Sequence, residues 1–407
     1  MRTLLFWLHL TAALTAGLVI VVMSATGTLL MYEKQVTAWA DGYRVAPTAG
    51  ATRLAVDDLL RAAAASRTSG TPAGITLQAE PTAPASVSFG REGTVFVDPY
   101  TGAVLGEGSK ATRAFFRSVT DWHRWLATDS DNRATGRAIT GAANLLFLFV
   151  VLSGLVIWWP RSWTAASLKS AVLFRGGLAG KARDFNWHNV VGFWSALPLA
   201  FIVATAVVMS YPWANDLLYR AAGTEPPPRP ATTSPPPAAQ GERRPESASV
   251  SVREPRSTDG AVVTTAAFAG LDSMVRSAAT QAPDWRTLTL RFAGPSAPVT
   301  VSVDTSTGAQ RPDLRSTLTF DRATGALTKS EAYSSQTRGR QWRAWARWIH
   351  TGEAFGLPGQ TIAGLVSLGS LVLAWTGVAL TWRRFRAWRA RRVRSASAPA
   401  IDEAVGA

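Results

Sequence analysis

The chain has 407 residues, of which 47% are hydrophobic and only 17% are charged, yet its formal net charge is +15. The apolar residues gather in four blocks and the arginines and lysines crowd the flanks of those blocks, which is a membrane pattern. No cysteine is present, which excludes disulfides, iron–sulfur clusters, thiolate-ligated haem and covalently attached c-type haem.

Each of the four apolar blocks is long enough to cross the hydrocarbon core of a bilayer, which takes about 20 helical residues. The first block follows Arg2 and could be a cleavable signal peptide, but its apolar run exceeds the roughly 7–15 residues of such a peptide. The sequence therefore predicts four transmembrane helices, without Asp, Glu, Lys or Arg, over Leu4–Met31, Ile139–Trp159, Val190–Trp213 and Thr361–Trp382.

Basic residues set the expected orientation, because short loops rich in Lys and Arg stay in the cytoplasm. The segment between the second and third blocks and the tail after the fourth are both rich in these residues. We therefore expect both termini in the cytoplasm, and residues 33–138 and 214–360 on the other side of a multi-pass membrane protein. The basic tail is interpreted as a topology anchor at the lipid bilayer, with no nucleic-acid partner.

The chain contains an internal repeat. At an offset of 179 residues, His9 falls on His188, Ala25-Thr26-Gly27 on Ala204-Thr205-Ala206, and Tyr32 on Tyr211. At an offset of 223, Ser153-Gly154 falls on Thr376-Gly377 and Gly136 on Gly359. Each half thus reads as helix, extracytoplasmic segment, helix. Both halves start on the same side, so they are predicted to be parallel repeats related by a pseudo-twofold axis along the membrane normal.

Each extracytoplasmic segment reads as a small α+β domain. Helical stretches over Val56–Ser66 and Ala266–Ala279 precede alternating strands. Three turns repeat one chemistry, in which Asp bonds the backbone two residues on and Gly supplies a positive φ. These turns are Asp98–Gly102, Asp304–Gly308 and Asp321–Gly325. A cation at such an aspartate is the less favoured interpretation.

The predicted fold is a four-transmembrane-helix bundle built from two parallel repeats, with two extracytoplasmic α+β domains. The second domain contains a Pro-rich insert, interpreted as a flexible linker. In chain order we predict helix 1 over 1–32, the first domain over 33–135, helix 2 over 136–160, a cytoplasmic loop over 161–187, helix 3 over 188–213, the second domain over 214–345 with its insert at 225–256, helix 4 with a preceding His segment over 346–383, and a basic cytoplasmic tail over 384–407.

Several motifs in this arrangement resemble the PepSY-associated transmembrane family of the bacterial inner membrane. They are Val97-Asp-Pro-Tyr-Thr-Gly102, Trp122-His123-Arg124-Trp125-Leu126, Asn186-Trp187-His188-Asn189 and Ser153-Gly-Leu-Val-Ile-Trp-Trp-Pro160. The resemblance covers residues 1–385 and implies PepSY-like extracytoplasmic domains. It includes iron-regulated proteins and ferric-siderophore reductases. Some relatives carry a fused flavoprotein reductase domain, which this chain lacks, so the resemblance leaves the electron donor open.

The four histidines of the chain fall into two pairs, each at the edges of the predicted helices. His9 and His188 each stand 23 residues before a matching tyrosine, about 35 Å along a helix, which places them near the cytoplasmic face. The twofold axis would set them at equal depth around the bundle centre. Two imidazoles facing each other across one iron are what a six-coordinate haem needs.

His123 and His350 form the second pair, on the extracytoplasmic side. They lie 13 and nine residues before Gly136 and Gly359, so their match is less exact. Both are set among Trp and Arg residues, which can cover a macrocycle and neutralise haem propionates. We therefore predict two b-type haems per chain, with His9, His188, His123 and His350 as axial ligands of the haem iron.

Other metal sites are less well supported. A structural zinc site needs four close protein ligands, and only Asp121 and Glu353 stand near the second His pair as added ligands for a mononuclear iron or copper ion. The bland alternative is that each histidine is a polar residue at the membrane interface without a metal. No nucleophile, proton-transfer residue or phosphate loop is found, so no catalytic side chain is assigned.

The resemblance implies a transmembrane ferric-chelate oxidoreductase. Two haems near opposite membrane faces would carry electrons from a quinol or a cytoplasmic reductase to a ferric siderophore or its periplasmic carrier. Two other functions stay open. Soluble relatives of the outer domains are linked to protease inhibition, which suggests a regulator that binds an envelope protease or partner protein. A transporter of iron or siderophore is the third, although helices without internal charge make a poor polar pathway.

Overall fold

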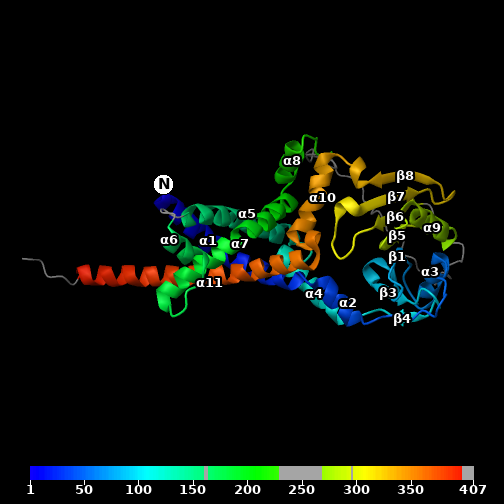
Figure 1. The fold of residues 1–407 in the computed structure, drawn as a ribbon, viewed down its shortest axis with the longest axis horizontal. Helices are drawn as coiled ribbons and strands as arrows, with labels where there is room; N and C mark the ends of the chain where they lie inside the picture. The colour runs from blue at the N-terminus through cyan, green and yellow to red at the C-terminus, as the bar shows by residue number, and fades with distance from the viewer. Residues whose placement is uncertain (160–163, 229–267, 295–296, 397–407) are drawn as a thin grey trace, which may run out of the picture.

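The computed structural model of the chain describes residues 1–159, 164–228, 268–294 and 297–396 (Figure 1). Within these residues, four helices are long and apolar enough to span a membrane. They are α1 (Arg2–Leu30), α5 (Arg133–Trp158), α7 (Gly180–Ser210) and α11 (Gly356–Ala396). The four apolar blocks of the sequence therefore form the four predicted helices, although α7 begins eight residues before 188 and α11 continues into the basic tail.

The four long helices form a bundle. Helix α1 packs against α5 and α11, and α7 packs against the same two helices. Small residues such as Ala16, Ala143 and Ser370 are buried between them, as is usual where membrane helices approach closely. Large apolar side chains such as Leu18 and Trp375 are exposed on the outside. Their exposure is what lipid-facing positions require.

The elements outside the bundle follow the same order in both halves of the chain. After α1 come α2 (Glu33–Asp41), α3 (Val56–Ala65), four strands and α4 (Lys110–Trp125). After α7 come α8 (Pro212–Ala221), α9 (Leu271–Gln281), four strands and α10 (Arg338–His350). A short helix, α6 (Ala165–Val172), connects α5 to α7. The Pro-rich insert predicted at 225–256 lies outside the described residues, apart from residues 225–228.

All eight strands form one antiparallel sheet, in the order β4-β3-β2-β1-β5-β6-β7-β8. The strands are β1 (Gly74–Gln78), β2 (Ala85–Ser88), β3 (Thr94–Val97), β4 (Val104–Gly106), β5 (Thr287–Arg291), β6 (Val299–Asp304), β7 (Arg315–Phe320) and β8 (Leu327–Ala332). Two separate domains were expected. The structure instead joins them at β1 and β5, which pair along their whole length, because each strand would otherwise present an unpaired edge.

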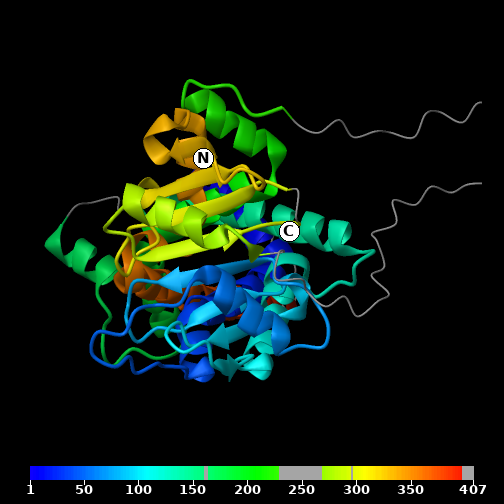
Figure 2. The ribbon, with the colours of Figure 1, turned by 90° about the vertical axis from the view of Figure 1, so that its right-hand side faces the viewer.

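Helices α3 and α9 cover the face of the sheet that points away from the bundle (Figures 1 and 2). One continuous apolar core fills the space between them and the sheet, with side chains from both halves of the chain, such as Leu60, Val87, Leu271 and Val301. The other side chains of the strands are largely Thr and Ser. This alternation is typical of an antiparallel sheet with one face on a core.

The two covering helices cap each other. The carboxylate of Asp272 accepts from the backbone N–H of Val56 at the start of α3 (2.9 Å), and Asp57 accepts from the N–H of Asp272 at the start of α9 (2.9 Å). Each aspartate thus satisfies a free N–H of the other helix. This exchange locks the halves together at the layer above the sheet.

The Asp–Gly turns form as the sequence predicts. Asp98 accepts from the N–H of Tyr100 (2.8 Å) and Asp321 from the N–H of Thr324 (2.8 Å), while Gly102 and Gly325 have φ of 75° and 70°. These turns close the β3–β4 and β7–β8 hairpins. The backbone bonds of the turn lower the pKa of Asp321, which fits a structural role for this carboxylate.

Candidate functional site

The structure brings His123 and His350 together at the end of the bundle nearest the sheet. His123 lies in the last turn of α4 and His350 is the last residue of α10. Their ring centres are 6.3 Å apart and the ring planes are tilted by 55°. The two histidines are 227 positions apart in the sequence (350 minus 123), so only the folding of the two halves against each other makes them neighbours.

The hydrogen bonds of this outer pair fix which ring nitrogen is free. His350 Nδ1 lies 2.9 Å from the backbone carbonyl oxygen of Ile202, which can only accept, so Nδ1 carries the proton. His123 Nδ1 lies 3.0 Å from Thr26 Oγ1. That hydroxyl donates to the carbonyl of Val22 (2.6 Å), so it accepts from Nδ1. In both rings Nε2 is therefore left with its lone pair available for a metal.

The inner histidines follow the same rule at the other end of the bundle. His9 Nδ1 on α1 bonds Ser153 Oγ on α5 (2.9 Å), and His188 Nδ1 on α7 bonds Thr376 Oγ1 on α11 (2.9 Å). Each hydroxyl donates to a carbonyl of its own helix, at 2.6 Å and 2.8 Å. His9 and His188 thus occupy equivalent places at the α1–α5 and α7–α11 interfaces, each with Nε2 free.

A glycine lies against three of the four imidazoles. A methyl group added at Gly27 would come within 3.2 Å of His123 Cε1, one at Gly154 within 3.5 Å of His9, and one at Gly377 within 3.7 Å of His188. In each case the glycine directly follows the hydroxyl residue that bonds the ring. The pair of residues both orients the imidazole and leaves room beside it.

Two further glycines fix the helices that carry the outer pair. A Cβ at Gly136 would lie 2.2 Å from the carbonyl of Trp125, and one at Gly359 would lie 2.3 Å from the carbonyl of Gly352. The starts of α5 and α11 therefore press against the chain just after His123 and His350. The four-residue difference in spacing is absorbed between these contacts, where Leu126 and Ala127 adopt left-handed φ of 54° and 53°.

The outer ring separation fits one metal held between two imidazoles. A first-row metal lies about 2 Å from an imidazole nitrogen, and that nitrogen lies about 1.2 Å from the ring centre. Two such ligands on opposite sides of one iron would put the ring centres about 6.4 Å apart, against the 6.3 Å found. Burial and then the charge of His350 lower the pKa of His123 to about 4, so this ring is neutral, as a ligand must be.

A metal held by protein side chains alone fits less well. Among the described residues no three His, Asp or Glu side chains converge on one point. Asp121 pairs with Arg133 (3.8 Å), and Glu353 pairs with Lys34. The two carboxylates that could have completed a mononuclear site are thus used elsewhere. A haem, which brings four nitrogen ligands of its own, needs only the two imidazoles.

Positive charge gathers beside the outer pair. Burial and the charges of Arg137, Arg347 and Arg133 lower the pKa of Arg124, which directly follows His123. Arg124 and Arg133 lie over the ring of Trp125, at 4.6 Å and 4.5 Å from its centre. Asp121 is the carboxylate that offsets this charge. We call Arg124, Arg133, Arg137 and Arg347 the outer arginine cluster, and it suits an anionic group.

The two His pairs lie far apart along α1. His9 and Thr26, the partner of His123, are 17 positions apart on this helix (26 minus 9), which corresponds to about 25 Å at 1.5 Å per residue. The pairs therefore lie near opposite ends of the membrane-spanning bundle.

Comparison with known families gives a match over nearly the whole chain. The family described as the PepSY-associated TM region matches residues 6–384, a range that includes all four histidines and their hydrogen-bond partners. No curated protein matches the chain.

Proposed function

Because the chain belongs to the PepSY-associated transmembrane family, we propose that it is a haem-b-containing membrane reductase that carries electrons across the bilayer to an extracytoplasmic ferric siderophore. The family makes it a membrane protein and agrees with the resemblance inferred from the sequence. The reductase activity rests on the histidines. The observation that carries it is the outer pair, whose rings stand 6.3 Å apart with both Nε2 atoms free.

The residues of the chain have three tasks in this proposal. His9 and His188 hold one haem and His123 and His350 hold the other. The hydroxyls of Ser153, Thr376 and Thr26 and the carbonyl of Ile202 orient these rings. The apolar bundle excludes water between the two sites. A bound haem supplies a one-electron carrier whose potential depends on such ligands and on burial.

The outer arginine cluster supports an anionic partner. Four guanidinium groups beside the outer pair can bind haem propionates, and a negatively charged ferric chelate would be drawn to the same surface. Reduction releases the metal, because oxygen-donor chelators hold ferric iron more tightly than ferrous iron. The two histidine pairs also fit a chain built from two parallel repeats, with both termini in the cytoplasm of a bacterium and the sheet outside the inner membrane.

The test is a dithionite-reduced minus oxidised optical spectrum of the detergent-purified, haem-replete chain, with haem measured per chain. We expect low-spin b-type bands and two haems per chain. His350→Ala should remove the outer haem and His9→Ala the inner one, so that each variant keeps one haem. A colourless protein would overturn the proposal and favour a binding module that regulates an envelope protein.

A further inference from the structure

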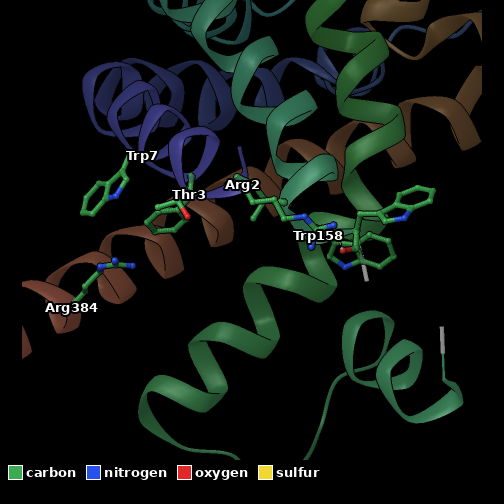
Figure 3. A pocket seen from close by; sticks show the side chains of 8 residues that line it. Arg2, Thr3, Trp7, Trp158 and Arg384 are labelled. Atoms are coloured by element: carbon green, nitrogen blue, oxygen red, sulfur yellow. Dashed lines mark hydrogen bonds between the residues drawn. The ribbon is translucent and has the colours of Figure 1, made fainter. Parts of the chain in front are cut away.

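A cavity of about 510 Å³ opens at the end of the bundle opposite the sheet. The first two turns of α1 contribute Arg2, Phe6 and Trp7, the end of α5 contributes Trp158 and Trp159, and α11 contributes Arg384 (Figure 3). Indole rings and a phenyl ring thus form its walls, with a guanidinium group on two of its three sides. None of these residues takes part in the proposed haem ligation.

A buried donor without an acceptor lines this cavity. The indole Nε1 of Trp158 is the buried side-chain nitrogen for which the described part of the chain offers no hydrogen-bond partner. The ring itself is fixed, because it stacks on Phe193 with centres 4.6 Å apart and planes at 24°. An unsatisfied buried N–H is costly, so its presence beside a cavity points to a ligand that brings an acceptor.

The two guanidinium groups add further donors. Arg2 donates to the carbonyl of Trp159 (3.2 Å), and Arg384 lies over the rings of Phe6 and Trp7 at 5.0 Å and 4.9 Å. Within the described residues neither arginine has a carboxylate at ion-pair distance. The cavity therefore offers N–H donors between flat apolar walls and calls for a flat ring with oxygen acceptors.

The position of the cavity narrows the ligand class further. Trp7 and Trp159 are 48% and 56% exposed on the outside of the bundle, at the level where a helix meets the membrane surface, so a lipid-soluble molecule can enter from the side. Phe6 stands one turn before His9, about 4.5 Å along α1. A ring bound in the cavity would lie next to the inner histidine pair.

We propose that this cavity binds the head group of a lipid-soluble quinol and is the point at which electrons enter the protein. The inference rests on the proposed function and names its electron donor. A quinol is a flat ring with two oxygens, which can accept from Trp158 Nε1 and from the guanidinium groups. Its apolar tail would remain in the lipid beside Trp7.

The electron balance is simple. The quinol loses two electrons and two protons and becomes a quinone. The electrons pass one at a time to the inner metal site and reduce two ferric chelates to ferrous. No carboxylate or histidine lines the cavity, so the protons leave to water at the membrane surface. Arg2 and Arg384 stabilise the quinol anion that forms when the first proton is lost.

The first test is equilibrium binding of menadione, a tail-less naphthoquinone, to the full-length protein in detergent, measured by calorimetry. Trp158→Phe removes the N–H and keeps the ring. We expect binding about tenfold weaker, the effect of one hydrogen bond in a buried site. Trp375→Phe, a lipid-facing indole on α11 outside the cavity, is the matched control and should bind as the wild type does. Arg384→Gln should also weaken binding, whereas Arg389→Gln should not.

Folding is checked separately. Because the Trp158 N–H has no partner, its removal should leave the melting temperature of the ligand-free protein unchanged or slightly raised. Weaker quinone binding in a variant with intact stability therefore reports on the cavity. Equal affinity in wild type and Trp158→Phe would overturn the proposal. So would failure to bind menadione combined with binding to vesicles of anionic phospholipid, which would make the cavity a lipid headgroup site.

A second measurement separates this inference from the proposed function. Stopped-flow absorbance follows haem reduction by menadiol and, in parallel, by dithionite. If dithionite reduces the haems and menadiol does not, the reductase stands and the quinol site is wrong. If the protein holds no haem, the reductase fails, while the binding comparison still tests the cavity. Reduction by menadiol that slows about tenfold in Trp158→Phe would support both.

Discussion

Each of the four imidazoles is oriented by a polar atom from a neighbouring helix. Three of these partners are hydroxyls that donate to their own helix and so must accept from the imidazole. Outer-shell partners of this kind hold a ligating histidine in one tautomer and one direction, and their loss typically costs 10- to 100-fold in metal affinity. The hydroxyls are thus testable parts of the proposed haem sites.

Thr26 offers the cleanest test of this orientation. Thr26→Val removes the hydroxyl that accepts from His123 and keeps the shape of the side chain, so we expect haem affinity at the outer site to fall by about tenfold or more. Haem titration of the apoprotein, followed by absorbance, measures this. Thr205 is the repeat equivalent on α7, and its hydroxyl bonds carbonyls of its own helix. Thr205→Val should therefore leave the titration unchanged, and an equal loss in both variants would argue against an orienting role.

Gly27 tests the space beside the outer imidazole. A methyl group there would lie 3.2 Å from His123 Cε1, which forces the ring to shift. Gly27→Ala should lower haem occupancy at the outer site while the helix keeps or gains stability, because alanine favours a helix by about 0.5–1 kcal/mol. Gly17→Ala on the same helix meets no atom within 4 Å and should change only stability. Full haem content in Gly27→Ala would show that the ring does not need this space.

The histidines and their orienting residues differ in how far the sequence reveals them. The pairs follow from the internal repeat, since His9 and His188 share an offset with Thr26 and Thr205. The hydroxyl partners stand in the same aligned motifs, Ser153-Gly154 and Thr376-Gly377, yet their role is visible only when two helices are placed side by side. A hydroxyl followed by glycine inside an apolar helix is the signal that could have identified them. The carbonyl of Ile202 leaves no sequence signal.

At the scale of elements, the junction between β1 and β5 joins the two halves. The predicted helix Val56–Ser66 and the Asp–Gly hairpins formed as expected, because their signals are local. The β1–β5 pairing was not predicted. It unites strands more than 200 positions apart whose patterns fit equally well at the edge of a separate sheet. Long-range pairing of this kind depends on the two halves meeting, as do the exchanged caps of Asp57 and Asp272.

A cross-link tests this junction directly. Thr76 and Thr289 lie opposite each other across β1 and β5, with hydroxyl oxygens 3.3 Å apart. In Thr76→Cys/Thr289→Cys we expect a disulfide to form on oxidation and to shift the mobility of the denatured protein. The chain has no other cysteine, so the bond is unambiguous. Ser302 pairs with Thr289 one strand further on, about 9.6 Å from Thr76. Thr76→Cys/Ser302→Cys should not cross-link, and equal cross-linking in both pairs would contradict the register.

At the scale of the whole molecule, charge and shape point in one direction. The sheet and the outer histidine pair lie at one end of the bundle, while the N-terminus and the arginine-rich end of α11 lie at the other (Figure 1). Seven arginines stand between residues 383 and 394. Basic flanks of this kind remain in the cytoplasm. The cavity near His9 would then face the side where reductant is made, and the outer arginine cluster the side where ferric chelates arrive.

This orientation predicts opposite labelling of two single-cysteine variants. Lys329 on β8 is exposed, with 61% of its side chain accessible, so Lys329→Cys should react with a membrane-impermeant maleimide in intact spheroplasts. Arg392→Cys, near the end of α11, should react only after the membrane is permeabilised, and its full reaction in the denatured protein serves as the control. Labelling of Arg392→Cys alone in intact spheroplasts would reverse the topology. It would then place the cavity of Trp158 on the outside, where it could not receive electrons from a donor reduced in the cytoplasm.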